Sequence, residues 1–424
     1  METQIVHRLI RKVTKRLNLK LLVAGAIFLY SCNGKTVDQS DLGTLTETPE
    51  FISGPIHLEF EKIIENRRDI FLSEFVSKID YIKLETNPAY LIGDKYVQVS
   101  LTDSLIIINE HGKPVGLFSK SGEFIREIGH IGKGPGEYDF DTHFRLDEEN
   151  RQLYVWNAMR RSIMVFDFMG QFLNEFKPEC KPNGFGYTGN NVFVTTQFNI
   201  RYADSILPKF IVFNEKGETI NRAYAYSKDP ARLGGGIAIM LPSYYEAPGG
   251  VVINTYENDT LFKAFPNGDL LPAITWDAGR LRVPYDILLE FERYMREKER
   301  YITGIEGLES ETYWLFSYHY QGKFNMALFN KNDESFTVVL NPDDELKGVI
   351  NDIDGGPSFW PRYNGTGGKI FVDILYPTQL KRWNDEGRFN RDDVLFPEKQ
   401  AKFREIAKNI DLDDNPVLMI VHLK

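Results

Sequence analysis

Short apolar segments separated by polar turns recur along most of the chain. Residues 104–129 contain an apolar segment, a turn, a second apolar segment, a Ser-Gly pair and a third apolar segment. Residues 152–176 and 191–220 repeat this design. An apolar run of this length, bounded by turn residues, predicts a β-strand. The chain is therefore expected to consist mainly of β-strands in a repeated unit.

The turns of this unit follow a regular spacing. The hairpin glycines Gly122, Gly170 and Gly217 are 48 and 47 residues apart, and each follows a Phe by four residues. Glycine is expected there because a tight hairpin requires positive φ. Further hairpins are predicted at Asn267-Gly268, after a spacing of 51, and at Asn332-Asp333.

The sixth unit is incomplete in sequence order. Only residues 369–375 form an obvious middle strand, but residues 79–84 and 416–421 at the two ends of the chain can supply the missing ones. A period near 48 built from four short strands is typical of a β-propeller blade. We therefore predict an all-β fold: a six-bladed β-propeller whose last blade is closed by N- and C-terminal strands. The alternative, a pair of β-sandwiches, would not produce a fixed period.

Two segments interrupt the repeat and are predicted to be helical, namely residues 284–301 and 377–414. Both fall in connections that a propeller places on one face, together with the loops between second and third strands. Apolar residues at helical spacing indicate packing on the parent domain rather than a docking surface. These residues are Ile287, Leu288, Phe291, Tyr294 and Met295 in the first insertion and Phe403, Ile406, Ala407 and Ile410 in the second.

The N-terminus has the pattern of an export signal. Six basic residues within 1–20 precede an apolar run over 21–30, which is too short to cross a bilayer. The run ends in Leu29-Tyr30-Ser31-Cys32, which resembles the processing box of bacterial lipoproteins. The resemblance implies a signal peptide over 1–31, acylation of Cys32, a tether over 32–70 and a propeller over 71–424. The alternative is an ordinary signal peptide with an incidental cysteine.

Composition narrows the class of protein. The chain of 424 residues is 42% hydrophobic and 26% charged, which excludes a disordered chain. A net charge of −10 argues against a nucleic-acid partner. With Cys32 acylated, Cys180 has no partner left in the chain, so no disulfide is predicted, and Cys180 is expected to be a buried small hydrophobic residue.

Three segments resemble a known family. REIGHIGKGPGEY (126–138), KIDYIKLET (78–86) and NPVLMIVHLK (415–424) are similar to segments of the six-bladed β-propeller lipoproteins of glycan-foraging Gram-negative bacteria, which are related in architecture to NHL-repeat propellers. The resemblance covers the chain from about residue 70 to its end. It implies the propeller fold and an envelope location, but the family has no single established activity.

Candidate ligand-binding residues come from loops on the face that bears the insertions, where propellers commonly bind ligands. Each also has an ordinary explanation as a surface or packing residue. The candidates are His111, Lys133, Glu137, Tyr138, Arg160, Arg161, Arg201, Tyr256, Glu257, His319 and Tyr320.

Motifs for particular chemistry are missing from the sequence. The glycine-rich stretch 132–138 fits neither a Walker loop nor a dinucleotide-binding loop and is interpreted as a rigid turn between blades. The seven histidines show no metal-binding spacing. Asp352, Asp354 and Gly355 form only a fragment of a calcium loop, so no cofactor or metal site is predicted.

Three functions remain open from the sequence. The first is a membrane-anchored binding or scaffolding module whose ligand is a glycan, a peptide or an envelope protein. The second is a hydrolase or lyase with a metal or carboxylates at the propeller axis, where residues from different blades meet without any sequence spacing. The third is a structural role in an envelope assembly. In each, we expect an outer-membrane lipoprotein, with the leaflet undetermined.

Overall fold

The fold is described from a computed structural model of the chain. Residues 1–54, which include the predicted signal peptide and Cys32, lie outside the described residues. The described residues are 55–93, 96–140, 142–197, 201–202, 205–206, 208–223, 242–255, 259–288, 290–340 and 348–424.

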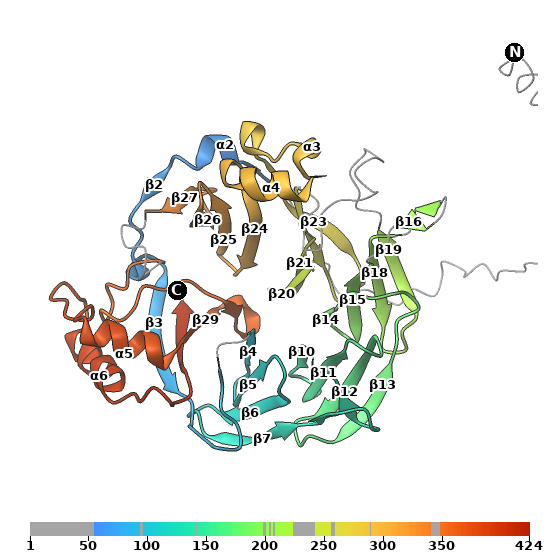
Figure 1. The fold of residues 1–424 in the computed structure, drawn as a ribbon, viewed down its shortest axis with the longest axis horizontal. Coiled ribbons are helices and arrows are strands. Elements are labelled where there is room, and N and C mark those ends of the chain that lie inside the picture. The colour runs from blue at the N-terminus through green and yellow to red at the C-terminus, as the bar shows by residue number, and fades with distance from the viewer. Residues whose placement is uncertain are drawn as a thin grey trace, which may run out of the picture. The chain divides into compact units, whose positions relative to one another are not determined.

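Six antiparallel sheets form the blades of a propeller, each with its first strand nearest the axis, so the six-bladed prediction is confirmed (Figure 1). Blades 1 to 3 consist of β4 (Val97–Leu101), β5 (Leu105–Glu110), β6 (Val115–Ser119) and β7 (Phe124–Ile128); β10 (Phe144–Asp147), β11 (Gln152–Asn157), β12 (Ser162–Asp167) and β13 (Phe172–Phe176); and β14 (Gly186–Gly189), β15 (Val192–Thr196), β18 (Phe210–Asn214) and β19 (Thr219–Ala223). Blades 4 to 6 consist of β20 (Ser243–Ala247), β21 (Gly250–Asn254), β22 (Thr260–Ala264) and β23 (Leu270–Asp277); β24 (Thr303–Glu309), β25 (Tyr313–Tyr320), β26 (Lys323–Asn330) and β27 (Phe336–Val339); and β28 (Tyr363–Asn364), β29 (Ile370–Leu375), β30 (Val417–Leu423) and β3 (Val76–Lys83).

The spaces between neighbouring sheets hold the hydrophobic core. One cluster joins Ile107 of blade 1 to Val155 and Phe166 of blade 2, and all three side chains are fully buried. Another joins Ile108 of blade 1 to Ile374 of blade 6. Each blade therefore buries both of its faces against its neighbours, which explains why apolar residues dominate its middle strands.

The two ends of the chain complete blade 6, as predicted. Strand β3 pairs antiparallel with β30, for example Ile79 with Val421 and Ile82 with Leu418. Strand β30 in turn pairs with β29, the middle strand expected over 369–375. A ring closed in this way leaves no open gap between its first and last blades.

The segment that precedes β3 in the chain runs along the outer edges of blades 4 and 5. Strand β1 (Ile56–Glu59) pairs parallel with β23 of blade 4, and β2 (Arg67–Arg68) pairs parallel with β27 of blade 5. Both strands lie within residues 32–70, which were predicted to be a tether. Their pairing satisfies backbone groups that would otherwise stay exposed on two edge strands.

Both predicted insertions contain helices. The first comprises α3 (Tyr285–Leu288), α4 (Phe291–Glu297) and the short 3₁₀ turn η4 (Lys298–Arg300), so it is two helices rather than the continuous one expected. The backbone of Glu290 is extended and separates α3 from α4. Met295, predicted to be part of the packing stripe, is 45% exposed, whereas Ile287 is buried.

The second insertion contains α5 (Pro377–Asp385) and α6 (Pro397–Lys408), which lie outside the ring beside β3 (Figure 1). Phe403, Ala407 and Ile410 are buried as predicted, and the Phe403 ring packs on Tyr81 of β3 at 4.5 Å. No helix among the described residues is long and apolar enough to cross a membrane.

The remaining elements are short. They are α2 (Phe60–Ile63), η1 (Leu72–Glu74), β8 (His130–Ile131), β9 (Glu137–Tyr138), β16 (Arg201–Tyr202), β17 (Ser205–Ile206), η3 (Gly279–Leu281) and η5 (Thr366–Gly368).

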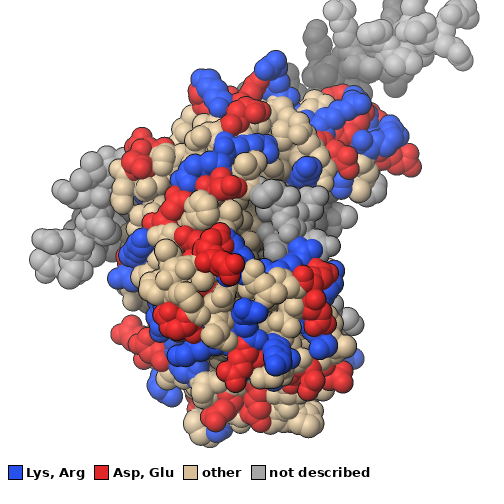
Figure 2. Space-filling model, turned by 90° about the vertical axis from the view of Figure 1, so that its left-hand side faces the viewer, with Lys and Arg blue, Asp and Glu red and all other residues tan. Residues whose placement is uncertain are grey.

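The side of the propeller that carries α5 and α6 bears charges of both signs. Figure 2 shows Lys and Arg interspersed with Asp and Glu over this side, without a large area of one sign. Several of these charges form exposed ion pairs, such as Arg391 with Asp393 at 2.8 Å. This surface therefore offers no extended electrostatic footprint for a polyanion.

The four predicted hairpin glycines all have positive φ, between 82° and 90°. At Gly217 a second constraint applies, because a Cβ would collide with the backbone carbonyl of Lys177. Gly112 has a similar φ of 87° but open space around it.

We predict that Gly217→Ala destabilises the protein more than Gly112→Ala does. Both substitutions incur the left-handed penalty of about 1–2 kcal/mol, and only the first adds steric overlap, worth roughly 1–3 kcal/mol more. Urea unfolding of the two variants measures the difference. Equal losses would mean that the hairpin of blade 3 does not approach residues 177–179 this closely.

Candidate functional site

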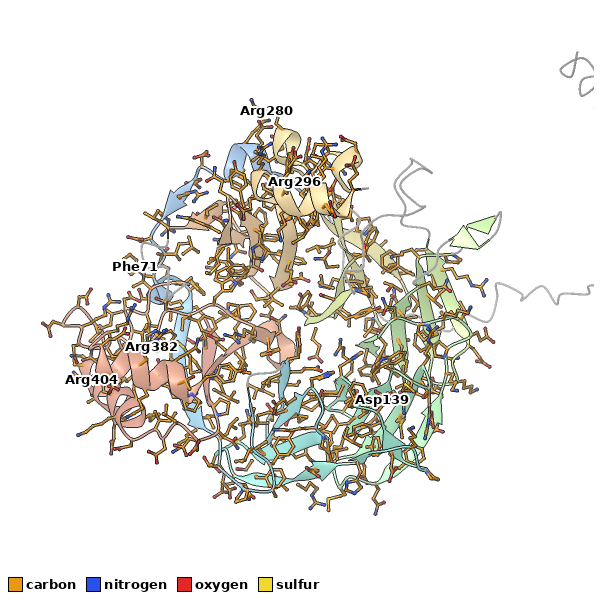
Figure 3. The ribbon with its side chains drawn as sticks, in the orientation of Figure 1. Phe71, Asp139, Arg280, Arg296, Arg382 and Arg404 are labelled. Carbon is orange, nitrogen blue, oxygen red and sulfur yellow. The ribbon has the colours of Figure 1, made fainter. Side chains whose placement is uncertain are left out.

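A cavity of about 490 Å³ lies on the propeller axis. All six blades contribute to its wall, and the surrounding side chains appear as sticks in Figure 3. The lining residues are Gln98, Val99 and Ser100; His143, Arg145, Trp156, Ala158 and Arg161; Pro182, Asn183 and Gly184; Pro242, Ser243, Tyr244, Tyr245 and Glu246; Leu308; and Arg362, Tyr363 and Asn364.

The cavity belongs to the face predicted for function. Most lining residues lie at or just before the beginning of an innermost strand, as His143 does before β10 and Asn183 before β14. Ala158 and Arg161 belong to the connection between β11 and β12, the second and third strands of blade 2. In a propeller these two kinds of position share one face.

Side chains from different blades meet across the axis. Arg145 of blade 2 donates from Nη2 to the carbonyl of Tyr244 in blade 4, at 3.3 Å. Asn364 of blade 6 donates from Nδ2 to the carbonyls of Glu246, at 2.5 Å, and Glu309, at 3.1 Å. These bonds hold the inner strands together and place Arg145 and Asn364, which are 7% and 8% exposed, in the cavity wall.

Further bonds connect adjacent inner strands. The Tyr244 hydroxyl donates to the carbonyl of Asn183 at 2.8 Å and accepts from the Thr196 amide at 3.0 Å. Gln98 of blade 1 donates to the carbonyl of Phe144 in blade 2 at 2.8 Å. The wall is thus a hydrogen-bonded ring rather than a set of independent loops.

Three polar atoms in this wall have no hydrogen-bond partner and are shielded from solvent. They are His143 Nε2, Arg145 Nε and Asn364 Oδ1. An unsatisfied buried polar atom costs about 1–3 kcal/mol, so natural proteins keep few of them. Their presence around one cavity marks it as the candidate binding site.

Burial also shifts the ionisation of the groups around the cavity. It holds the pKa of His143 well below its ordinary value, and the nearby charge of Arg145 lowers this pKa further. Burial lowers the pKa of the Arg145 guanidinium, with partial compensation from Glu246. Burial raises the pKa of Glu246, which the charge of Arg145 opposes.

The His143 ring has a fixed orientation. It packs against Trp156, at a centroid distance of 5.9 Å, and against Phe185, at 5.5 Å, and these two rings also contact each other at 6.2 Å. The Arg145 guanidinium lies 5.7 Å from the centroid of the same Phe185 ring. Aromatic packing therefore holds both polar side chains in place.

A second cavity of about 420 Å³ adjoins the first between blades 5 and 6. It shares Tyr245, Leu308 and Arg362 with the axial cavity and adds the aromatic side chains of Phe324 and Trp360. Arg362 forms an ion pair with Asp373 at 3.0 Å. Burial raises the pKa of Asp373 to about 6, although Arg362 opposes the shift.

Of the residues nominated from the sequence, Arg161 lines the axial cavity. Its neighbour Arg160 lies elsewhere: it forms an ion pair with Glu175 at 3.3 Å and donates to the carbonyls of Lys133 and Gly134 at 2.9 and 3.1 Å. Arg160 therefore supports the glycine-rich loop.

That loop is built as a turn between blades, in line with the interpretation of residues 132–138. The carboxylate of Glu137 accepts a bond from the Gly134 amide at 2.7 Å. Tyr138 is fully buried between blades 1 and 2, where its hydroxyl donates to the carbonyl of Ile128 and accepts from the Val115 amide. Tyr138 thus contributes to the core and not to the axial opening, and Lys133 is exposed.

The other nominated residues lie away from the axial cavity or outside the description. His111 packs edge-on against Phe140 at 5.6 Å, and His319 against Phe324 at 5.4 Å. Tyr320 packs against the core between blades 4 and 5. Tyr256, Glu257 and the side chain of Arg201 lie outside the described residues.

The carboxylates of the calcium-loop fragment have internal partners. Asp352 accepts from the hydroxyl and amide of Ser73 at 2.5 and 3.0 Å, and Asp354 accepts from Tyr81 at 3.0 Å. Within the described ranges, no group of three or more His, Cys, Asp or Glu side chains is arranged to hold a metal ion.

Sequence reasoning missed His143, Arg145, Glu246 and Asn364. They come from three blades and share no local motif, since the axis brings together residues that are about a hundred positions apart. One signal was available: a His and an Arg two residues apart at the beginning of a predicted inner strand must lie on the same side of that strand.

Residues 55–422 match the family described as "Domain of unknown function (DUF4934)". No curated protein matches the sequence. Among solved structures, a predicted exported protein of Bacteroides fragilis is similar at 16% identity, with a TM-score of 0.65, over 87% of this chain and 99% of that one.

Two more distant structures complete the comparison. A member of the DUF4221 family from Bacteroides vulgatus has a TM-score of 0.45 at 9% identity, over 82% of this chain and 97% of that one. The virginiamycin B lyase of Staphylococcus aureus has a TM-score of 0.37 at 11% identity, over 70% and 80%. At these identities the comparisons with solved structures concern the fold alone.

We predict that Asp373→Asn becomes stabilising relative to the wild type as the pH rises. Because the folded-state pKa of Asp373 is about 6, above its ordinary value near 4, the folded protein binds the proton more tightly. The stability this provides is present below pH 4 and is lost between pH 4 and 6, by on the order of 1–3 kcal/mol. Urea unfolding at pH 4 and pH 7.5 measures the change.

Asp393→Asn is the control for this experiment. The hydrogen bond and charge of Arg391 lower the pKa of the exposed Asp393. The stability of Asp393→Asn relative to the wild type should therefore fall slightly as the pH rises. If the free energies of unfolding of Asp373→Asn and the wild type differed by the same amount at both pH values, the raised pKa of a buried Asp373 would be contradicted.

Proposed function

The chain belongs to the DUF4934 family, and we propose that it is a binding and scaffolding module of the cell envelope that holds a glycan in its axial cavity. The observation that carries the proposal is the wall of that cavity. All six blades contribute to it, and it combines charged, amide and aromatic side chains. A concave site with a few convergent polar groups is the usual form of a small-molecule binding site.

The mixture of side chains favours a glycan among the candidate ligands. Sugar hydroxyl groups both donate and accept hydrogen bonds, which suits a wall that offers guanidinium donors and the acceptors Asn364 and Glu246. The C–H faces of sugar rings pack on aromatic faces, and Trp156 and Tyr245 are among the aromatic residues of the wall. A volume of about 490 Å³ is within the range for small ligands.

The same wall favours binding over the alternative of glycoside hydrolysis. Glycoside hydrolysis ordinarily uses two carboxylates on either side of the bond that is cut. Glu246 is the one carboxylate among the described residues that line the axial cavity. Product formation from a bound oligosaccharide would support the enzyme alternative instead.

The envelope location is part of the proposal. The basic segment, the short apolar run and Cys32 at its end support export followed by lipid anchoring. The structural similarity to a predicted exported protein of Bacteroides fragilis is consistent with export. Two acyl chains or more would provide a durable anchor in the membrane.

We predict that oligosaccharides raise the melting temperature of the purified protein and that Ala158→Trp abolishes the effect. A ligand at 100 times its dissociation constant adds about 2.7 kcal/mol to the free energy of unfolding, which raises Tm by a few degrees. Ala158 lines the cavity, so a Trp there occupies ligand space without removing a side-chain hydrogen bond. Thermal unfolding with a panel of oligosaccharides, peptides and divalent metals measures the shift.

Met159→Trp is the matched control. Met159 is the next residue but is 78% exposed and outside the cavity wall, so its variant should keep the full ligand shift. A shift with peptides alone, or one that a chelator removes, would contradict glycan binding. An unchanged shift in Ala158→Trp would place the ligand elsewhere.

We predict that Cys32→Ser moves the protein from the membrane fraction to the soluble fraction of lysed cells, since it removes the acylated side chain. Cys180→Ser is the control, because Cys180 packs against the core between blades 2 and 3. Fractionation followed by immunoblotting measures the distribution. A variant that stays membrane-bound would contradict anchoring through Cys32.

A further inference from the structure

The charges around the axial cavity do not balance within the described part of the chain. Arg362 is neutralised by its ion pair with Asp373, and the lowered pKa of His143 keeps its ring neutral near pH 7. Arg145 and Arg161 are then opposed by the single carboxylate of Glu246. The wall therefore carries about one net positive charge.

Arg145 makes only weak use of its charge. Its Nη atoms donate to the neutral carbonyls of Phe144, at 2.6 Å, and Tyr244, at 3.3 Å, while its Nε has no partner. A hydrogen bond from a guanidinium to a carboxylate is about twice as strong as one to a neutral acceptor. A guanidinium that is 7% exposed and lacks a contact carboxylate is prepared for an anion.

The opposite part of the wall offers acceptors. Asn364 uses both hydrogens of its amide on backbone carbonyls, so its Oδ1 is left without a partner, and because this atom is shielded from solvent a ligand reaches it only after the side chain shifts. Glu246 lies next to it, since Asn364 donates to the Glu246 carbonyl. A ligand that fills this cavity therefore needs an anionic group at one end and donors, such as hydroxyl groups, at the other.

We propose that the axial cavity selects an acidic sugar, whose carboxylate binds between Arg145 and Arg161 and whose hydroxyl groups face Asn364 and Glu246. This inference rests on the proposed glycan-binding function and specifies its ligand class. One carboxylate seated between the two arginines matches the net charge of the wall, whereas a phosphate dianion at the same position exceeds it. A neutral sugar leaves Arg145 without an anion.

The second cavity lets the ligand be longer than one sugar. It meets the axial cavity at Tyr245, Leu308 and Arg362 and continues past Phe324 and Trp360. The aromatic side chains in its lining suit the faces of further sugar rings. We therefore assign the axial cavity to an acidic residue of an oligosaccharide and the adjoining cavity to its neighbour.

The test compares matched acidic and neutral sugars on the purified full-length protein. Trigalacturonic acid and α-1,4-linked galactotriose differ only at C6, which is a carboxyl group in the first and a hydroxymethyl group in the second, and isothermal titration calorimetry at pH 7 measures their affinities. We expect trigalacturonic acid to bind at least tenfold more tightly, with an affinity that falls as the salt concentration rises. Galactose 6-phosphate and galacturonic acid, compared in the same way, distinguish a phosphate from a carboxylate.

Variants then locate the carboxylate. Arg161→Gln should lower the affinity for trigalacturonic acid by roughly ten- to hundredfold, the loss expected for a charged hydrogen bond. It should leave the affinity for galactotriose unchanged. Arg161 is exposed on a loop, so this variant should fold normally. Arg296→Gln is the matched control, because Arg296 is an exposed arginine of α4 (Figure 3). This variant should bind both sugars as the wild type does.

The outcomes separate this inference from the proposed function. Equal affinity for the acidic and neutral trisaccharides, or an equal loss of both in Arg161→Gln, would overturn the acidic-sugar assignment while glycan binding stands. Tighter binding of the sugar phosphate than of galacturonic acid would also overturn it. Binding of neither trisaccharide, together with no shift from any oligosaccharide in the thermal panel, would overturn both.

Discussion

The antiparallel pairing of β3 with β30 is the contact on which the rest of the structure depends. It joins residues more than 300 positions apart, such as Ile79 and Val421, and so closes the ring. The core between blades 6 and 1 forms only when this closure brings Ile374 against Ile108. A contact of such long range is slow to form because loop closure has an entropic cost, but it positions all six inner strands around one axis.

The convergence of six strands at an axis has a physical consequence for the site. Each inner strand presents its side chains to a space too narrow for large apolar groups from every blade, so some of that space stays open and polar. Hydrogen bonds across the axis, such as those from Arg145 and Asn364, keep the inner strands in register. The unpartnered atoms that remain reduce stability, and a protein can retain this loss where a ligand recovers it on binding.

Much of the fold could be predicted from local chemistry. Gly122, Gly170 and Gly217 mark hairpins that require positive φ, and their spacing gave the blade count. The N-terminal edge strands could not be predicted, because β1 and β2 acquire strand structure only by pairing with β23 and β27. The first insertion was expected as a single helix, and its apolar pattern does not reveal the extended backbone at Glu290 that separates α3 from α4.

The sequence alone determined the repeat and the closure of the last blade by strands from both ends, because these depend on periodicity and turn residues that neighbours in the chain reveal. It nominated Arg161, which lines the axial cavity, but not His143, Arg145, Glu246 or Asn364. Only the tertiary structure brought those four together, since the distance between two residues at a propeller axis is unrelated to their separation in sequence. It also gave Arg160 and Tyr138 structural roles, because burial and hydrogen bonding are properties of the packed blades.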